Sequence, residues 1–537
     1  MLAIVIQVIL SFFICFNFSF FFLTKTKIIF KNPVKYILFG LFPIAILIRI
    51  WHLFLPINEY TLVLFLFVSI LIYINYKAII NCILFDLKKL ILENKFTFIL
   101  ASFLTIYFSS LTSISYDEGL YHAGFISWVN KYKIINGLAN IESRFGFNSN
   151  WHLLDALFNG YHILPNISNS INTFIALVFT LYFLSEKNSR WIILFIFFPI
   201  IIIYHLIDPS ADFVIYLFTI ALVVDLFKER ERDLFWIFAF LFLVTVKINA
   251  LILFPLLVIY YMPFFKKVKK YPIAWTPLLL FSFFLFGPWI YANFLLSGYL
   301  IFPYFEINSI SPIWKLDAIE VINTMNGISF TPFCKYTGIS LENATNYNKF
   351  QQFFLWFRDV RIIDKLLFLF SLSSILGLIF QRRKNKMQLI SSLFIFLIFI
   401  IYVIMVPDPR FFLGIGFAAF ICMLFNYPLI LNIVNSHRLI AIITIIQFSV
   451  TLYLYVNLYP KILSNQSYSL FNPIYKAGYQ YSPSIKKSID GVKFSIPIGN
   501  EFNWDVSPAI LKEKTSLKKI GHEINDGFYN TPTVHKK

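Results

Sequence analysis

Long apolar segments follow one another from residue 1 to residue 459, and they constrain the fold more than any other feature of this chain. A helix needs about 20 mostly apolar residues to cross the hydrocarbon core of a bilayer. The segments do not alternate apolar and polar residues, as the strands of an outer-membrane barrel do. We therefore predict an all-α polytopic membrane protein of about fourteen transmembrane helices, near residues 2–23, 37–55, 61–82, 96–113, 167–184, 190–207, 211–227, 234–246, 248–263, 273–295, 363–380, 388–406, 411–427 and 439–459.

Composition excludes a water-soluble fold, because 59% of the residues are hydrophobic and only 13% are charged. The first segment has no basic start and no small-residue cleavage site, so we interpret it as a helix and not as a secretory signal. The four cysteines form no C-x-x-C pair. Neither a disulfide framework nor a cysteine metal site is therefore expected.

The distribution of Lys and Arg predicts the topology. Connections rich in these residues, at 24–36, 83–95, 185–190, 228–233, 264–272 and 381–387, alternate with connections that hold almost none. The positive-inside rule places the basic connections in the cytoplasm. The N-terminus, the long loops 114–166 and 296–362 and the tail 460–537 are then expected outside, in a bacterial inner membrane. We interpret the basic residues behind the net charge of +18 mainly as a signal for membrane orientation. Nucleic-acid binding is not expected, because these residues are spread over many short loops and form no single patch.

The first outer loop opens with two adjacent acids, Asp117 and Glu118, directly after the helix near 96–113. Apolar residues then recur at helical spacing over 121–132 and again over 153–161, which predicts two amphipathic helices lying at the membrane interface. The two acids have a simple structural explanation as a helix N-cap and a first-turn acid. A role in chemistry is the alternative.

Further ionisable residues fall at the same predicted outer edge. Asp208 and Asp212 flank a turn, and Lys247 interrupts a long apolar segment. Asp408 and Arg410 stand together between two later helices. Such residues near a membrane are by default functional or paired. Structural ion pairs between Asp408 and Arg410, or between Asp212 and Lys247, are therefore one interpretation, and a polar cavity at the outer leaflet is the other.

These features resemble the GT-C superfamily of integral membrane glycosyltransferases, in which an acidic motif after a transmembrane helix leads into two juxtamembrane helices. More closely, Y-D-E-G-L-Y-H (116–122) followed by R-F-G-F-N-S-N-W-H (144–152) is similar to an uncharacterised family of bacterial polytopic membrane proteins. That similarity covers the chain from about residue 96 to Asp526-Gly527-Phe528. Here the acidic motif follows the fourth helix instead of the first. The resemblance thus implies three additional helices in 1–95, a GT-C-like core in 96–459 and a small outer tail in 460–537.

The resemblance implies transfer of a sugar from a polyprenyl-phosphate donor to a glycan, lipid or protein acceptor, with inversion. Asp117 is then the base and Glu118 the group that orients the acceptor, or the reverse, and the adjacent like charges raise the pKa of one of them. Lys247, Arg410 and Arg144 are candidates to hold the phosphate. His122, Asp208 and Asp212 complete the candidate substrate-binding residues. A divalent metal near His122 and His152 is left open.

Two other functions remain alternatives. A transporter or flippase of lipid-linked sugars predicts paired repeats and polar residues near the membrane midplane, and we find no such repeat. An O-antigen polymerase or ligase would use Arg and His of a large late loop, where 296–362 offers Arg358 and Arg361 but no His. In the tail, Val492, Phe494 and Ile496 alternate as in a short strand, and we interpret its eleven lysines as solvated surface.

Overall fold

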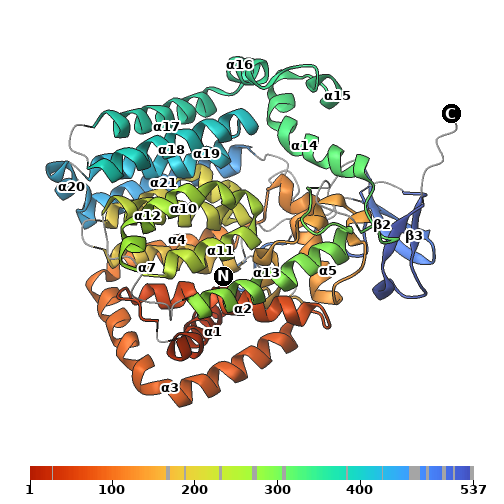
Figure 1. Cartoon of the computed structure of the whole chain (residues 1–537), viewed down its shortest axis with the longest axis horizontal. Helices are drawn as coiled ribbons and strands as arrows, with labels where there is room; N and C mark the ends of the chain where they lie inside the picture. The colour runs from red at the N-terminus through yellow and green to blue at the C-terminus, as the bar shows by residue number, and fades with distance from the viewer. Residues whose placement is uncertain are drawn as a thin grey trace.

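The computed structural model describes residues 1–26, 28–164, 170–186, 189–228, 233–268, 275–304, 310–381, 385–425, 427–458, 472–478, 483–498, 504–511 and 514–531. Parts of the predicted basic connections, of the second outer loop and of the tail lie outside these residues. Within them the chain is mostly helical, with a small β region near the C-terminus (Figure 1).

The first half of the chain contains the helices α1 Leu2–Thr26, α2 Val34–His52, α3 Glu59–Glu93, α4 Lys95–Ser109, η1 Glu118–His122, α5 Ala123–Lys131, η2 Leu138–Asn140, η3 Ser143–Phe147, α6 Asn150–Phe158, α7 Ser170–Leu184, η4 Arg190–Ile192, α8 Ile193–Ile196, α9 Pro199–Ile201, η5 Ile202–Leu206, α10 Ala211–Phe227, α11 Phe235–Val246, η6 Ile248–Leu253 and α12 Phe254–Val268. The second half contains α13 Trp275–Ser297, α14 Ala318–Thr337, α15 Leu341–Ala344, α16 Lys349–Asp359, α17 Ile362–Phe380, α18 Lys386–Met405, α19 Pro409–Leu424, α20 Pro428–Val434, α21 His437–Leu458 and η8 Ile524–Asp526.

Seven of the described helices, namely α1, α2, α3, α13, α17, α18 and α21, are long and apolar enough to cross a membrane. Five shorter apolar helices of 10–17 residues add to them. The prediction of a helical protein with several candidate membrane spans is confirmed. Two predicted boundaries are wrong, since α3 continues through most of the expected connection 83–95, and the expected helix 190–207 is divided into short pieces. Pro199, which lacks an N–H donor, begins one of these pieces.

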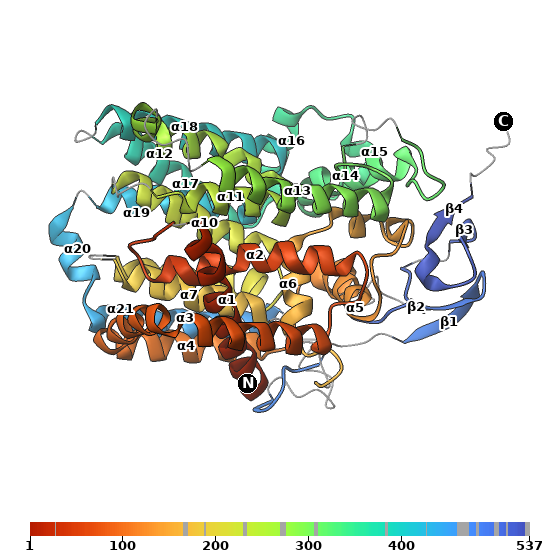
Figure 2. The same ribbon diagram turned by 60° about the horizontal axis from the view of Figure 1, so that its bottom comes forward.

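Figure 2 shows most of the helices side by side, with α20 at one end of the molecule and α5, α14 and the strands at the other. One hydrophobic cluster extends from Ile14 in α1 to Phe528 in the last strand. Residues of α1 and α2 belong to this core. A buried polar contact also joins α2 to the later helices, since Arg49 Nε donates to Asn150 Oδ1 of α6 at 2.9 Å. Residues 1–95 therefore pack as an integral part of the molecule.

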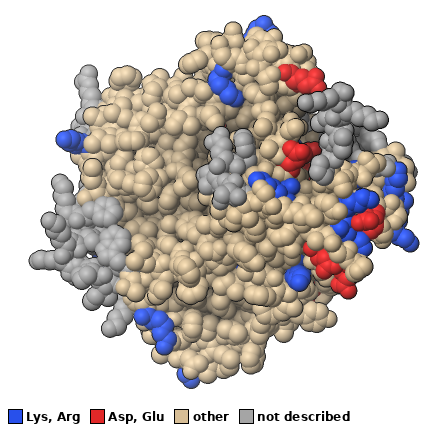
Figure 3. Space-filling view, turned by 45° about the vertical axis from the view of Figure 1, so that its right-hand side comes forward, with Lys and Arg blue, Asp and Glu red and all other residues tan. Residues whose placement is uncertain are grey.

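The tail forms two small antiparallel pairs. Strands β1 Ser484–Ile489 and β2 Val492–Pro497 are joined by Asp490 and Gly491, whose φ angles of +48° and +80° suit a tight hairpin turn. Strands β3 Leu517–Lys519 and β4 Phe528–Asn530 form the second pair. The strand predicted near Val492 is thus confirmed. Acidic side chains on the face in Figure 3 lie in its right-hand half, where several Lys and Arg side chains also gather.

Candidate functional site

The two adjacent acids of the first outer loop point in different directions. Asp117 Oδ2 accepts a hydrogen bond from Arg410 Nη1 at 2.8 Å, and about a third of each side chain is exposed. Glu118 is fully buried, with its Oε1 3.4 Å from Lys476 Nζ of the tail. The Asp117 side chain makes no capping hydrogen bond to η1, so the N-cap explanation is wrong. Of the two acids, Asp117 is the one that a ligand can reach.

Arg410 links α19 to the segment that carries Asp117, and Lys247 links the junction of α11 and η6 to α10. Arg410 Nε lies 3.1 Å from Asp408 Oδ2, and Asp408 also caps α19 by accepting from the backbone N–H of Arg410. Lys247, between α11 and η6, forms an ion pair with Asp212 in the first turn of α10. Both ion pairs considered from the sequence are therefore present. We call Asp117, Asp212, Lys247, Asp408 and Arg410 the charge cluster.

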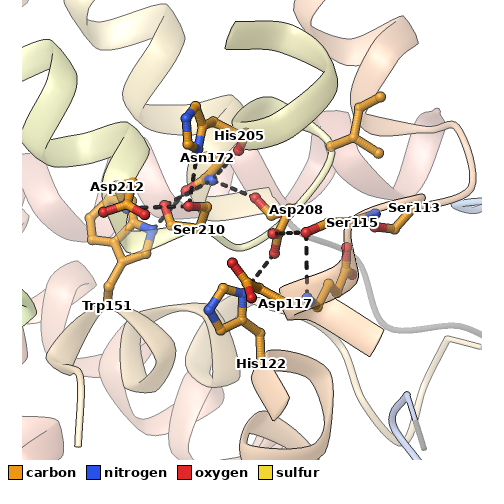
Figure 4. A network of polar contacts seen from close by, with 12 residues as sticks. Ser113, Ser115, Asp117, His122, Trp151, Asn172, His205, Asp208, Ser210 and Asp212 are labelled. Carbon is orange, nitrogen blue, oxygen red and sulfur yellow. Dashed lines mark hydrogen bonds and ion pairs between the residues drawn. The ribbon is translucent and has the colours of Figure 1, made fainter. Parts of the chain in front are cut away.

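The Asp208 side chain contacts both Ser115 and His122 of the segment that carries Asp117 (Figure 4). Its Oδ2 accepts from the Ser115 hydroxyl at 2.5 Å, and its Oδ1 lies 2.9 Å from His122 Nδ1. Asp208 is almost completely buried, so it can reach a ligand only through these partners. Its structural effect is to hold both ends of the segment 115–122 that presents Asp117.

A buried amide fixes the turn that carries Asp208 and Asp212 (Figure 4). Asn172 Nδ2 of α7 donates to the carbonyl oxygens of His205 and Asp208 at 2.7 and 2.6 Å. Its Oδ1 accepts from Trp151 Nε1 of α6 at 2.7 Å. The side chain of Asn172 is thus surrounded by partners from three segments. Backbone carbonyls at an irregular turn need such donors when water is excluded.

A narrow cleft lies beside the charge cluster, between α10, α18 and α19. Asp212 and Arg410 contribute its polar lining, and Ile215, Phe411 and Ile415 are among its apolar residues. Its open space is about 20 Å³, which is room for about one water molecule. A larger ligand can enter only if these helices move apart. The combination of charged groups with an apolar wall suits an amphiphilic ligand.

The electrostatics of the cluster favour an ionised Asp117. Burial opposes ionisation, but the positive charges of Arg410 and His122 outweigh it and hold the pKa of Asp117 below its usual value. The net shift of the Asp117 pKa is therefore downward, although the sequence led us to expect a raised pKa at one of the two acids. Burial raises the pKa of Tyr121 well above the usual value, and the carboxylates of Asp117 and Asp212 raise it further. The Tyr121 hydroxyl is thus a neutral donor close to the cluster.

The second motif, 144–152, has a structural role. Asn148 adopts a left-handed conformation, with φ of +51°, and its carbonyl oxygen accepts from both Arg49 and Trp289. Ser149 caps α6 by accepting from the backbone of Trp151, and Asn150 Nδ2 donates to Thr245 Oγ1 at 2.8 Å. The motif therefore joins α2, α6, α11 and α13. The two helices predicted here are present as α5 and α6, and nearly all of their residues are buried within the molecule.

Several other candidates make their direct contacts outside the charge cluster. Arg144 pairs with Glu142 of its own loop at 3.1 Å. The rings of His152 and His122 are in tilted contact with their centroids 4.7 Å apart, and burial lowers the pKa of His152 far below its usual value. Among the described residues no three His, Cys, Asp or Glu side chains are grouped to hold a metal ion. Arg358 and Arg361 pair with the acids Asp359 and Asp364.

Three residues of the site were not predicted from the sequence. Asn172 and Ser115 carry a weak signal, since each is a polar residue at the end of an apolar segment. Lys476 carries none, because nothing near it in the sequence distinguishes it from the other lysines of the tail. Its side chain is only 1% exposed, so the interpretation of these lysines as solvated surface is wrong for Lys476.

The His122–Asp208 pair predicts a pH dependence of stability. Burial alone would lower the pKa of His122, but Asp208 raises it above its usual value. The stabilisation is then complete below the unfolded-state pKa of about 6.5 and is lost as the pH rises through the folded-state pKa. We expect the difference in melting temperature between the wild type and His122→Gln to shrink from pH 6 to pH 9. A constant difference, measured by tryptophan fluorescence in detergent, would contradict a charged pair.

Comparison with known proteins places the chain in a family. Searches of curated proteins and of solved structures find no match. The family described as "Domain of unknown function (DUF8201)" matches residues 1–417. The matched region begins at the first residue, so it includes the helices of 1–95 as well as every member of the charge cluster. Because the match covers most of the sequence, the chain belongs to this DUF8201 family.

Proposed function

We propose that this protein is an inverting glycosyltransferase of GT-C type, which moves a sugar from a polyprenyl-phosphate donor to an acceptor on the outer face of the bacterial inner membrane. The observation that carries the proposal is the charge cluster beside a narrow cleft with both polar and apolar lining. Asp117 and Asp212 there face the cations Arg410 and Lys247. A lipid phosphate combines the same two properties, a charged head and an apolar tail.

Each group of the cluster has a role in this reaction. The acceptor hydroxyl attacks the anomeric carbon while the bond to the phosphate oxygen breaks, and Asp117 takes the proton of the hydroxyl. Arg410 and Lys247 bind the departing phosphate, Arg410 through two nitrogens and Lys247 as a point charge. When phosphate binds Arg410, the cation is shared between phosphate and Asp117. The basicity of Asp117 then rises with the donor in place.

The resemblance and the position of Asp117 support a base, whereas the burial of Glu118 does not support contact with an acceptor. The proposed topology has fourteen spans, with the N-terminus and the tail outside the cytoplasm. It is consistent with the grouping of α5, α14 and the strands at one end of the molecule (Figure 2). The charge cluster then lies at the outer leaflet.

The proposal is tested with purified protein in proteoliposomes, given a panel of polyprenyl-phosphate sugars together with envelope lipids and glycans from a deletion strain. We expect release of polyprenyl phosphate and labelling of an acceptor. Movement of the donor across the bilayer without release of phosphate would instead identify a flippase. No turnover of any donor in the panel would count against a transferase.

Replacing Arg410 or Lys247 tests the phosphate-binding roles. We expect Arg410→Gln to weaken binding of polyprenyl phosphate about tenfold or more, since a charge-assisted hydrogen bond contributes roughly 1.5–3 kcal/mol. Lys247→Gln should weaken it in the same direction. Binding is measured by native mass spectrometry, with Arg358→Gln as the control because Arg358 pairs with Asp359 on α16. Unchanged affinity in both variants would reject the site.

A further inference from the structure

The first part of the described tail returns to the start of the chain and to the end of α4. The N–H groups of Leu2 and Ala3 donate to the carbonyl oxygens of Pro473 and Ile474 at 3.1 and 2.9 Å. Next along the chain, the N–H of Ala477 donates to the carbonyl of Ser110 at 2.9 Å. These backbone contacts fix residues 472–478 against the start of α1 and against Ser110, which precedes the loop that carries Asp117.

Lys476 extends from this segment into a buried acidic environment. Its Nζ lies 3.4 Å from both Glu118 Oε1 and the carbonyl oxygen of Ile207. Asp155 of α6 is within electrostatic reach of Lys476, of Glu118 and of Asp208. A buried carboxylate is costly unless it is paired. Lys476 therefore compensates the buried charge of Glu118 from a distant part of the sequence.

A later part of the tail contacts the residues that follow Glu118. The N–H of Trp504 donates to the carbonyl of Gly119 at 3.0 Å, and the Trp504 side chain packs on Ala123. A Cβ atom at Gly124 would lie 3.3 Å from the Trp504 carbonyl oxygen, which shows how closely the two segments approach. Further along, the Ser507 hydroxyl lies 2.8 Å from that of Ser127. Segment 118–127 is thus contacted by the tail at several points.

We propose that the C-terminal tail completes the site, with Lys476 as a positioning residue that pairs with Glu118 and so holds Asp117 and His122 toward the charge cluster. Glu118 lies between Asp117 and the rest of η1, so a change in its position moves both of its functional neighbours. The tail follows the residues matched by the family, which end at 417. The role of Glu118 is then to anchor the turn, and the role of Lys476 is to compensate its charge.

The test compares Lys476→Met with Lys476→Arg in the full chain, in nanodiscs. The readout is hydrogen–deuterium exchange of peptides that cover 111–131, measured without substrate. We expect Lys476→Met to exchange about tenfold faster or more, since it removes a charged hydrogen bond, and Lys476→Arg to retain the slow exchange. Lys486→Met is the matched control, because Lys486 is an exposed lysine of the same tail. Wild-type exchange in Lys476→Met would overturn the proposal.

A double variant covers the case in which Lys476→Met does not fold. Lys476→Met combined with Glu118→Gln removes both charges and is expected to recover a folded protein with a higher melting temperature than Lys476→Met alone. Failure to recover would show that Glu118 is not the group that Lys476 compensates, and would overturn the proposal. Neither readout depends on sugar transfer, so the positioning role and the proposed function can fail separately.

A kinetic readout rests on the proposed function. If the wild type transfers sugar, Lys476→Met is expected to lower kcat while leaving the KM for the donor within about twofold, because Arg410 and Lys247 are untouched. Activity equal to that of the wild type, with faster exchange, would count against a positioning role and leave a purely structural one.

Discussion

Asp117→Asn is expected to lower the rate of sugar transfer by about 10²–10⁴-fold, the range that removal of a general base produces. The amide has nearly the shape of the carboxylate but cannot take a proton at neutral pH. Stability should change little, because an ion pair between partly exposed groups contributes roughly 0–1 kcal/mol. Transfer is measured in proteoliposomes and by recovery of cell-surface glycans in a deletion strain.

The matched control for Asp117→Asn is Asp359→Asn. Asp359 is also an acid paired with an arginine, Arg358, but it lies on α16 outside the charge cluster. This variant should retain full activity. If Asp117→Asn restores surface glycans as well as the wild type does, the catalytic role proposed for Asp117 is wrong. A loss of activity accompanied by a large fall in melting temperature would indicate a structural role instead.

Asn172→Ala is expected to destabilise the folded protein by several kcal/mol, in the upper range for single substitutions. The alanine leaves the carbonyl oxygens of His205 and Asp208, and the N–H of the Trp151 indole, without the partner that Asn172 supplies. Each such buried group costs about 1–3 kcal/mol when its partner is removed. The melting temperature in detergent should fall accordingly, and Asp208 should lose its fixed position.

Asn75→Ala provides the comparison for Asn172→Ala. Asn75 is an exposed residue of α3, and among the described residues its side chain bonds to one group, the carbonyl oxygen of Leu71 in its own helix. Its replacement should leave the melting temperature almost unchanged. Equal melting temperatures for Asn172→Ala and the wild type would show that other groups satisfy the turn between η5 and α10.

Local signals in the sequence predicted the helical elements well where they are continuous. Segments such as 2–23, 211–227 and 363–380 match α1, α10 and α17 closely, because an apolar run of sufficient length is itself the requirement for such a helix. The segment 190–207 is equally apolar, yet it is divided at Pro199 and by the π-helical turn η5. The hydrophobicity of a segment does not show where its helix is interrupted when neighbouring helices stabilise the interruption.

The sequence predicted most residues of the candidate site, but only some of the contacts between them. Asp117, Asp212, Lys247 and Arg410 were expected on one side of the membrane, and the structure brings them together. Arg144 was expected with them but pairs locally with Glu142. The distribution of Lys and Arg predicts on which side of the membrane the end of a helix lies. It does not predict the rotation of that helix about its own axis.

The sequence by itself determined that the protein is helical with several candidate membrane spans, and where its acidic motif lies, since both depend on residues adjacent in the chain. The tertiary structure decided which groups meet. Asp117 meets Arg410 from 293 residues away, and Glu118 meets Lys476 from 358 residues away. Such contacts arise from helix packing and from the path of the tail, which are properties of the whole chain. For that reason two adjacent acids, indistinguishable in the sequence, have a partly exposed and a fully buried environment.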